Sequence, residues 1–162
     1  MPRLPRHVGR VQRLRGEARA ARVRGLCAAE PAPGVLAYDG ATPVGWCGVS
    51  PRSSMERLRR SRTMPPLDDL PVWSVVCFVV RSSHRRKGVS AALLAGAVDY
   101  ARLCGAPAVE GYPVDPEGAR ISSSAAHVGT TSLFEAAGFE RIRPTEARAD
   151  RRVRWLMRRD LR

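Results

Sequence analysis

The sequence feature that most limits the fold is an apolar run that leads through a short basic segment into a helical pattern. The run covers residues 72–80 and is rich in β-branched and aromatic side chains, so it predicts a strand buried on both faces of a sheet. Apolar residues at three- and four-residue steps then predict a helix over residues 89–103, which ends near Gly105 and Pro107. A helix that directly follows a central strand predicts an α/β arrangement.

The rest of the chain supplies further helices and strands. Periodicity and turn signals predict a helix, a hairpin and two short strands, over residues 8–28, 34–49, 108–112 and 153–157. S-x-x-E patterns, which typically begin helices, start at Ser53 and Ser132. Hairpins mixed with crossover helices predict a mixed sheet. The sequence shows no internal repeat and no linker, so residues 1–162 are expected to form a single domain.

The segment between the strand and the helix, Arg85-Arg86-Lys87-Gly88-Val89-Ser90, has the composition of an anion-binding turn. The first N–H groups of a helix lack partners within the helix, and the helix dipole adds positive potential at this end. Gly88 allows a ligand to approach the backbone, and three basic side chains precede it. The turn therefore predicts a site for phosphate groups, although it has neither the P-loop pattern nor G-x-G-x-x-G.

The formal net charge of +13 is concentrated at the two ends of the chain. Residues 1–25 carry a net charge of +7 and residues 141–162 carry +6, whereas residues 26–140 are neutral. A protein whose main partner is a nucleic acid is expected to place its basic residues on the recognition element, which this neutral body does not do. Solvated arginine faces are the simpler interpretation of the ends, and nucleic-acid binding through them is kept as an alternative.

Composition and residue spacing exclude several other classes of protein. With 44% hydrophobic and 27% charged residues the chain reads as globular, and no apolar stretch is long enough to cross a membrane. The first residues lack the apolar segment of a secretory signal, so a cytoplasmic location is expected. No two of the four cysteines stand at C-x₂-C spacing, and the three histidines show no ligand pattern, so no metal site is expected.

Several segments of the sequence resemble the GCN5-related N-acetyltransferase (GNAT) family. Arg85-x-x-Gly88-x-Ser90 matches two of the three fixed positions of the family's acyl-CoA signature, Q/R-x-x-G-x-G/A. Residues 134–139, Phe-Glu-Ala-Ala-Gly-Phe, resemble the family's YExxGF corner between a helix and a strand. Further segments resemble certain bacterial members, at residues 43–47, 71–78 and 110–115. The resemblance covers roughly residues 34–160 and implies a mixed, largely antiparallel central sheet with splayed central strands, flanked by helices.

The resemblance also implies how acetyl-CoA is held. The backbone of Phe78, Val79 and Val80 would pair with the pantetheine arm like an added strand. The N–H groups of Arg86 to Ser90 would bind the pyrophosphate, and the Arg85 side chain would reach a phosphate oxygen. The acyl thioester would then lie where the two central strands splay apart. A primary amine would attack it directly, in a ternary complex of enzyme, acetyl-CoA and acceptor.

The catalytic residues are less constrained, because the sequence departs from the family here. Many members place a Tyr general acid where this chain has Phe134. The Phe134 side chain is expected to contact the cofactor, but it has no hydroxyl and cannot donate a proton. Glu110 is the candidate base, followed by Asp115, and Tyr112 is the candidate acid. Each has a structural alternative: Glu110 as a surface carboxylate paired with an arginine, Asp115 as a turn cap, and Tyr112 as a packing residue.

Three other features have both a functional and a structural interpretation. Trp46 and Trp73 are either walls of an acceptor pocket or core residues, and the latter is the commoner role. The segment over residues 113–128 either closes over the acceptor or is simply a loop. Cys77 lies in an apolar run, which favours a buried thiol over a covalent acyl-cysteine role.

The N-terminal part over residues 1–33 predicts one helix, whereas the family usually opens with a strand and two helices. A shortened N-terminal part is therefore expected, and a partner chain is one way to complete the acceptor side, since relatives often form homodimers. Three functions remain from the sequence. They are an N-acetyltransferase that uses acetyl-CoA, a CoA-binding relative without activity, and a nucleic-acid-binding protein that acts through its arginine-rich ends.

Overall fold

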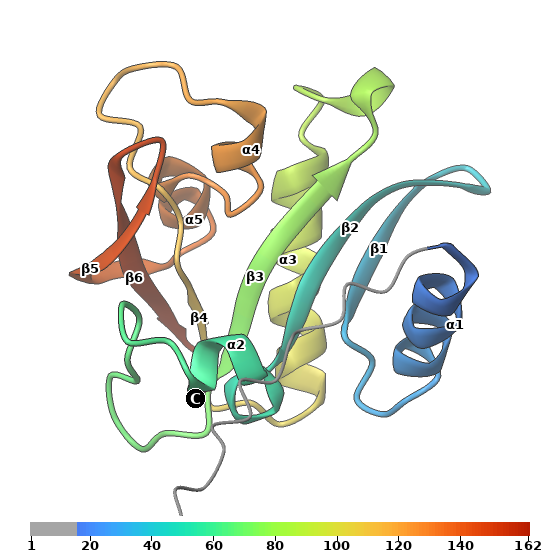
Figure 1. The fold of residues 1–162 in the computed structure, drawn as a ribbon, viewed down its shortest axis with the longest axis horizontal. Coiled ribbons are helices and arrows are strands. Elements are labelled where there is room, and N and C mark those ends of the chain that lie inside the picture. The colour runs from blue at the N-terminus through green and yellow to red at the C-terminus, as the bar shows by residue number, and fades with distance from the viewer. Residues whose placement is uncertain (1–15) are drawn as a thin grey trace, which may run out of the picture.

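The structure, a computed structural model, describes residues 16–162 and contains an open six-stranded sheet (Figure 1). The strand order is β1-β2-β3-β4-β6-β5, in which β3 and β4 are parallel and the other pairs are antiparallel. The strands are β1 (Gly34–Asp39), β2 (Thr42–Pro51), β3 (Trp73–Val80), β4 (Ala108–Gly111), β5 (Glu140–Ala149) and β6 (Arg152–Asp160). The helices are α1 (Gly16–Cys27), α2 (Glu56–Arg59), α3 (Val89–Leu103), α4 (Ser123–Ala126) and α5 (Thr131–Ala136).

The central unit predicted from the sequence is confirmed. The buried strand corresponds to β3, and the helix after the basic turn corresponds to α3 with the expected bounds. The mixed, largely antiparallel sheet is also confirmed. The expected N-terminal helix is present as α1, and its first predicted residues, 8–15, lie outside the described residues.

Two predicted helix starts are wrong. Ser53 lies in a 3₁₀ turn over Arg52–Ser54, and α2 begins after Met55 without a side-chain cap. At α5 the cap is Thr130, whose side-chain oxygen accepts a hydrogen bond from the Leu133 N–H at 3.3 Å. Thr130 has extended backbone geometry immediately before the helix, as a cap requires, whereas Ser132 is already inside it.

The main core lies between α3 and the sheet, with α3 behind the strands in Figure 1. The partner of Gly48 on β3 is Cys77, but the partner of Val49 is Val75, so Val76 is an extra residue that forms a bulge. Because of this bulge, Val75 and Phe78 both belong to the core on the α3 side. Val76 instead packs with a second cluster on the opposite face, which is formed by Leu58, Tyr112 and Leu156.

The parallel strands β3 and β4 separate soon after they meet. Their pairs are Trp73–Val109, Ser74–Glu110 and Val75–Gly111, and β4 ends at the last of these. The rest of β3 pairs with β2 alone, which leaves its other edge open to a further backbone. This is the splay that the family resemblance implies. Within the described residues, no helix is long and apolar enough to span a membrane.

Candidate active site

The basic turn after β3 forms an exposed cradle at the start of α3. Gly88 caps the helix with a φ of 78°, and Arg86 has a φ of 61°, so the chain turns sharply before the first helical N–H groups. A Cβ added at Gly88 would meet no atom within 4 Å, which shows that the backbone is open to an approaching group. Among the described residues, none of the three basic side chains of the turn forms an ion pair. Their charge is therefore available to an anion.

Two adjoining cavities connect this cradle to the open edge of β3. One, of about 250 Å³, extends along the turn from Val80 to Ala91 and is closed by Leu133. The other, also about 250 Å³, lies beside Phe78, Val79 and Val80 and is bounded by His127. They share Val80, Arg85 and Ser90. The structure thus brings together most of the residues that the sequence assigned to CoA, along one track from the splay to the helix start, although Lys87 and Phe134 line neither cavity.

The segment over residues 113–128 lies partly against that track. The Phe78 N–H, on the open edge of β3, donates a hydrogen bond to the carbonyl oxygen of His127 at 2.6 Å. Ser122 holds the segment from its other side, where its N–H and its Oγ donate to the Asp150 carboxylate at 2.6 and 2.8 Å. The second half of this segment therefore borders the predicted cofactor track.

Glu110 and Tyr112 lie on the face of the sheet that is turned away from α3, in a buried network. Glu110 is 1% exposed, and its Oε1 accepts hydrogen bonds from Arg158 Nη2 at 2.6 Å and Nε at 3.0 Å. The Tyr112 hydroxyl donates to Glu110 Oε2 at 3.2 Å and accepts from Arg52 Nε at the same distance. Arg158 also binds both Asp68 oxygens, at 2.6 and 2.9 Å. The expected pairing of Glu110 with an arginine is present, but at a buried site and not on the surface.

This network determines what each group can do chemically. Burial, followed by the nearby Glu110 charge, raises the pKa of Tyr112 above that of a free tyrosine. Tyr112 therefore keeps its proton at neutral pH and can donate a hydrogen bond or a proton. Glu110 is hydrogen-bonded through both oxygens, so any proton it accepts must arrive through this network.

Phe134 lies in the core at the junction of the two central strands and is 0% exposed. Its ring makes edge contacts with Phe78 and Phe139, with ring centroids 6.2 and 4.9 Å away. A Cβ added at Gly111 would lie 2.1 Å from its Cε1 atom, and one at Gly129 would lie 2.8 Å from Cε2. Phe134 lines neither of the two cavities described above, so its ring is a core residue that packs beneath the predicted cofactor track.

The remaining candidates lie in structural positions. Asp115 accepts from the Glu117 N–H at 3.0 Å and from Arg141 Nη1 at 2.6 Å, and these bonds lower its pKa. It caps a turn, and a lowered pKa makes it a weak base. Burial raises the pKa of both Cys77 and Cys47, which keeps them as thiols and disfavours a covalent role.

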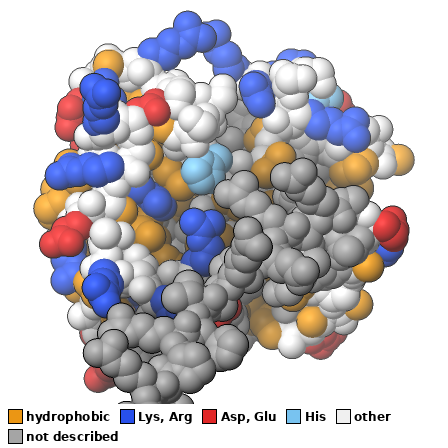
Figure 2. Space-filling view, in the orientation of Figure 1, with side chains coloured by type: hydrophobic (Ala, Val, Ile, Leu, Met, Phe, Trp, Pro, Cys, Tyr) orange, Lys and Arg blue, Asp and Glu red, His pale blue; other side chains and the backbone are white. Residues whose placement is uncertain are grey.

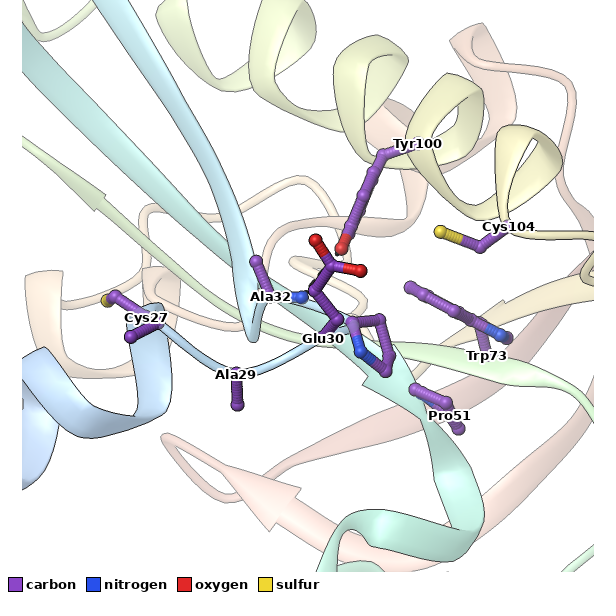
Figure 3. A pocket seen from close by; sticks show the side chains of 10 residues that line it. Cys27, Ala29, Glu30, Ala32, Pro51, Trp73, Tyr100 and Cys104 are labelled. Atoms are coloured by element: carbon purple, nitrogen blue, oxygen red, sulfur yellow. Dashed lines mark hydrogen bonds between the residues drawn. The ribbon is translucent and has the colours of Figure 1, made fainter.

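The two tryptophans do not form one pocket. Trp73 faces α3, where its ring meets Tyr100 edge-on at 5.4 Å. Trp46 pairs with Leu36 and Val79 and lies on the other face, over Gly34 and Gly48. Trp73 instead borders a cavity of about 760 Å³ at the far end of α3 from the basic turn. Figure 3 shows this cavity, in which Tyr100 reaches toward the segment before β1 and accepts a hydrogen bond from the Ala32 N–H at 2.7 Å.

Sequence reasoning missed the arginines that surround Glu110 and Tyr112. Arg158 and Arg154 belong to the basic C-terminal end, which was interpreted as solvated. In the structure both are partly buried, and Arg52 is 8% exposed. The alternation of polar and apolar residues along 152–158 was an available signal, because it places Arg154, Leu156 and Arg158 on one face.

Comparison with known proteins agrees with this geometry. The sequence model of the Acetyltransferase (GNAT) family matches residues 8–116, which is most of the chain. No curated protein matches. Among solved structures, a GCN5-related N-acetyltransferase from Kribbella flavida is 20% identical with a TM-score of 0.54, over 87% of this chain and 76% of that one.

Two further structures share the fold. A GNAT-family acetyltransferase from Streptococcus pneumoniae is 15% identical with a TM-score of 0.58, over 93% of this chain and 79% of that one. A chain of the NatC complex, solved with a Gag peptide and CoA, is 16% identical with a TM-score of 0.58, over 88% and 79%. The splayed sheet, the turn before α3 and the family match lead to one conclusion: this chain belongs to the GNAT acetyltransferase family.

Proposed function

We propose that this protein transfers an acetyl group from acetyl-CoA to a primary amine, directly and in a ternary complex. The observation that carries the proposal is the continuous track formed by the two cavities between Phe78 and Ser90. At one end an open strand edge can pair with the pantetheine arm. At the other, the basic side chains of the turn and the helical N–H groups can hold the pyrophosphate.

The reaction requires one bond to form and one to break. The amine nitrogen attacks the thioester carbonyl carbon, the carbon–sulfur bond breaks, and CoA leaves as a thiolate that takes up a proton. The acceptor ammonium must first lose a proton, which we assign to Glu110 by way of the Tyr112 hydroxyl, since these two groups are hydrogen-bonded at 3.2 Å. Tyr112, with its raised pKa, is the proposed proton donor to the thiolate.

Isothermal titration calorimetry with acetyl-CoA, followed by detection of released CoA thiol with a panel of primary amines, tests the proposal. Saturable binding and amine-dependent thiol release are expected. Absence of saturable binding up to millimolar acetyl-CoA would reject it. The experiment also separates the second candidate, a CoA-binding protein without activity, which is favoured by the missing hydroxyl at Phe134. That candidate predicts binding without thiol release.

Nucleic-acid binding is less favoured by the structure. Four arginines of the C-terminal end form ion pairs with carboxylates, namely Arg141, Arg152, Arg158 and Arg162. Much of the positive charge that this end contributes is therefore neutralised within the molecule. A proposed cytoplasmic location and a homodimer remain predictions of the sequence.

A further inference from the structure

Arg154 occupies the face of the splay that lies away from α3. It precedes Leu156 by two residues on β6, so both project to the same face of the sheet. Its Nε donates to the carbonyl oxygen of Tyr112 at 2.8 Å, just beyond the last residue of β4. The cofactor track follows the open edge of β3 toward the start of α3. Figure 2 views the molecule from the face opposite α3 and shows basic and apolar side chains in a hollow near its middle.

The charge of Arg154 is not compensated within the part of the chain that the structure describes. Its neighbour on the same face, Arg158, binds two carboxylates, but Arg154 forms no ion pair there. Its Nη1 and Nη2 atoms donate no hydrogen bond to a described residue, and residues 1–15 contain no Asp or Glu. Desolvation lowers the pKa of Arg154, Tyr112 opposes this effect, and the nearby charge of Arg57 adds to it. A partly buried cation without a counterion is costly, so an anion at this position would be stabilised.

We propose that Arg154 binds a carboxylate carried by the acceptor, so that the substrates are amines of the amino-acid type. The inference rests on the proposed acetyl transfer and adds the chemical class of its acceptor. The two terminal NH₂ groups of one planar guanidinium, which bond to no other described residue, match the two oxygens of a carboxylate. An acceptor held there would enter from the face opposite α3, with its amine directed toward Tyr112 and the splay.

The acceptor's charge can be varied while its amine is kept. Thiol release at saturating acetyl-CoA is measured with alanine against alaninamide, and with γ-aminobutyrate against 4-aminobutanamide. For whichever of the two amino acids is the better acceptor, we expect kcat/KM to exceed that of its amide by at least about tenfold. Arg154→Gln should raise KM for the acids by roughly tenfold to a hundredfold, with kcat and acetyl-CoA affinity little changed, and Arg154→Lys should restore part of the loss.

Arg159 supplies the matched control. It is also a partly buried arginine of β6 that donates to one carbonyl, that of Ala137 at 2.7 Å, but it faces the other side of the strand. Arg159→Gln should therefore leave the preference for acids unchanged. Equal kinetics for acids and amides, or an equal effect of both substitutions, would contradict the assignment to Arg154.

A second readout does not depend on turnover. The NMR signal of the Arg154 Nε–H group, identified by its loss in Arg154→Lys, is followed while N-acetylalanine or N-acetylalaninamide is added, with and without CoA. A saturable shift with N-acetylalanine but not with N-acetylalaninamide supports the proposal, even if Arg154→Gln is unstable or no tested amine is acetylated. No shift with the acid overturns it. Absence of acetyl-CoA binding in calorimetry would instead reject the proposed function, so the two failures are distinguishable.

Discussion

The Phe78 N–H and the His127 carbonyl oxygen form a hydrogen bond of 2.6 Å across the gap where β3 has lost β4 as a partner. Phe78 is one of the residues whose backbone we assign to the pantetheine arm. If that assignment holds, the cofactor and the segment before Gly129 would compete for the same donor. Gly118 within this segment and Gly129 directly after it both have positive φ, at 75° and 80°, so the chain adopts turns there that suit glycine.

Asp150→Asn should increase the affinity for acetyl-CoA. The Asp150 carboxylate accepts both the N–H and the Oγ of Ser122, and these bonds hold the segment against β3. Weakening them should ease displacement of His127 and lower the Kd by up to about tenfold in calorimetry. Asp160→Asn is the control, because Asp160 is also exposed but bonds to Arg162 at the end of the chain. An unchanged or higher Kd in Asp150→Asn would show that the segment does not compete.

Substitutions at Gly88 should separate backbone strain from charge in the anion cradle. Gly88→Ala forces a Cβ into a left-handed conformation at a cost of about 1–2 kcal/mol but leaves the N–H groups exposed. We expect it to weaken acetyl-CoA binding by less than about tenfold. Gly88→Glu adds a negative charge beside the phosphates and should weaken binding by more than roughly a hundredfold. If both variants bound acetyl-CoA like the parent, the pyrophosphate would have to lie elsewhere.

Glu110→Gln should reduce both activity and stability. The substitution removes the negative charge that Arg158 binds at 2.6 Å in a buried site, which should cost about 1–3 kcal/mol of unfolding free energy. If Glu110 is the base, kcat should also fall by roughly 10²–10⁴. Asp68→Asn removes the more exposed partner of Arg158 and leaves Glu110 in place, so kcat should persist in that variant. If the measured kcat falls only as far as the fraction of folded protein falls, Glu110 is a structural residue and not the base.

Gly111→Ala should destabilise the protein through the Phe134 ring. The added Cβ would lie 2.1 Å from Cε1, so strand or ring must move, which typically costs about 1–3 kcal/mol and lowers Tm by about 2–12 °C in a chain of this size. Phe134→Leu leaves more room at this point and should recover part of the loss when the two substitutions are combined. Strictly additive Tm changes would show that Gly111 and Phe134 are not coupled.

Asp115 should contribute stability at neutral pH that is lost in acid. The Glu117 N–H and the Arg141 side chain lower its folded-state pKa below the unfolded value of about 3.9. A lowered pKa contributes stability fully above the unfolded value and loses it as the pH falls through the folded value. Asp115→Asn should thus be less stable than the parent at pH 7, on the order of 1 kcal/mol in urea unfolding. The difference should shrink below about pH 4, and a difference independent of pH would refute this account.

Local pattern was enough to predict the central unit. The apolar run of β3 and the helical spacing of α3 each involve neighbours in the chain, so hydrophobic period and helix-ending residues identify them. The open conformation at Gly88 follows from the same local logic, because glycine adopts positive φ at little cost. The caps at Ser53 and Ser132 were wrong because backbone geometry, and not the sequence pattern, decides which side chain can reach the helix N–H groups.

Tertiary structure alone decided the polar chemistry of the site. Arg158 and Glu110 are 48 residues apart, and Arg154 and Tyr112 are 42 apart, so their pairing depends on β4 and β6 becoming neighbours. No local period encodes that contact, and an arginine that will be buried looks in the sequence like one that remains solvated. The sequence by itself determined the strand, turn and helix that we propose as the site for a cofactor's phosphates. Only the folded sheet decided which carboxylate is neutralised and which arginine has no counterion among residues 16–162.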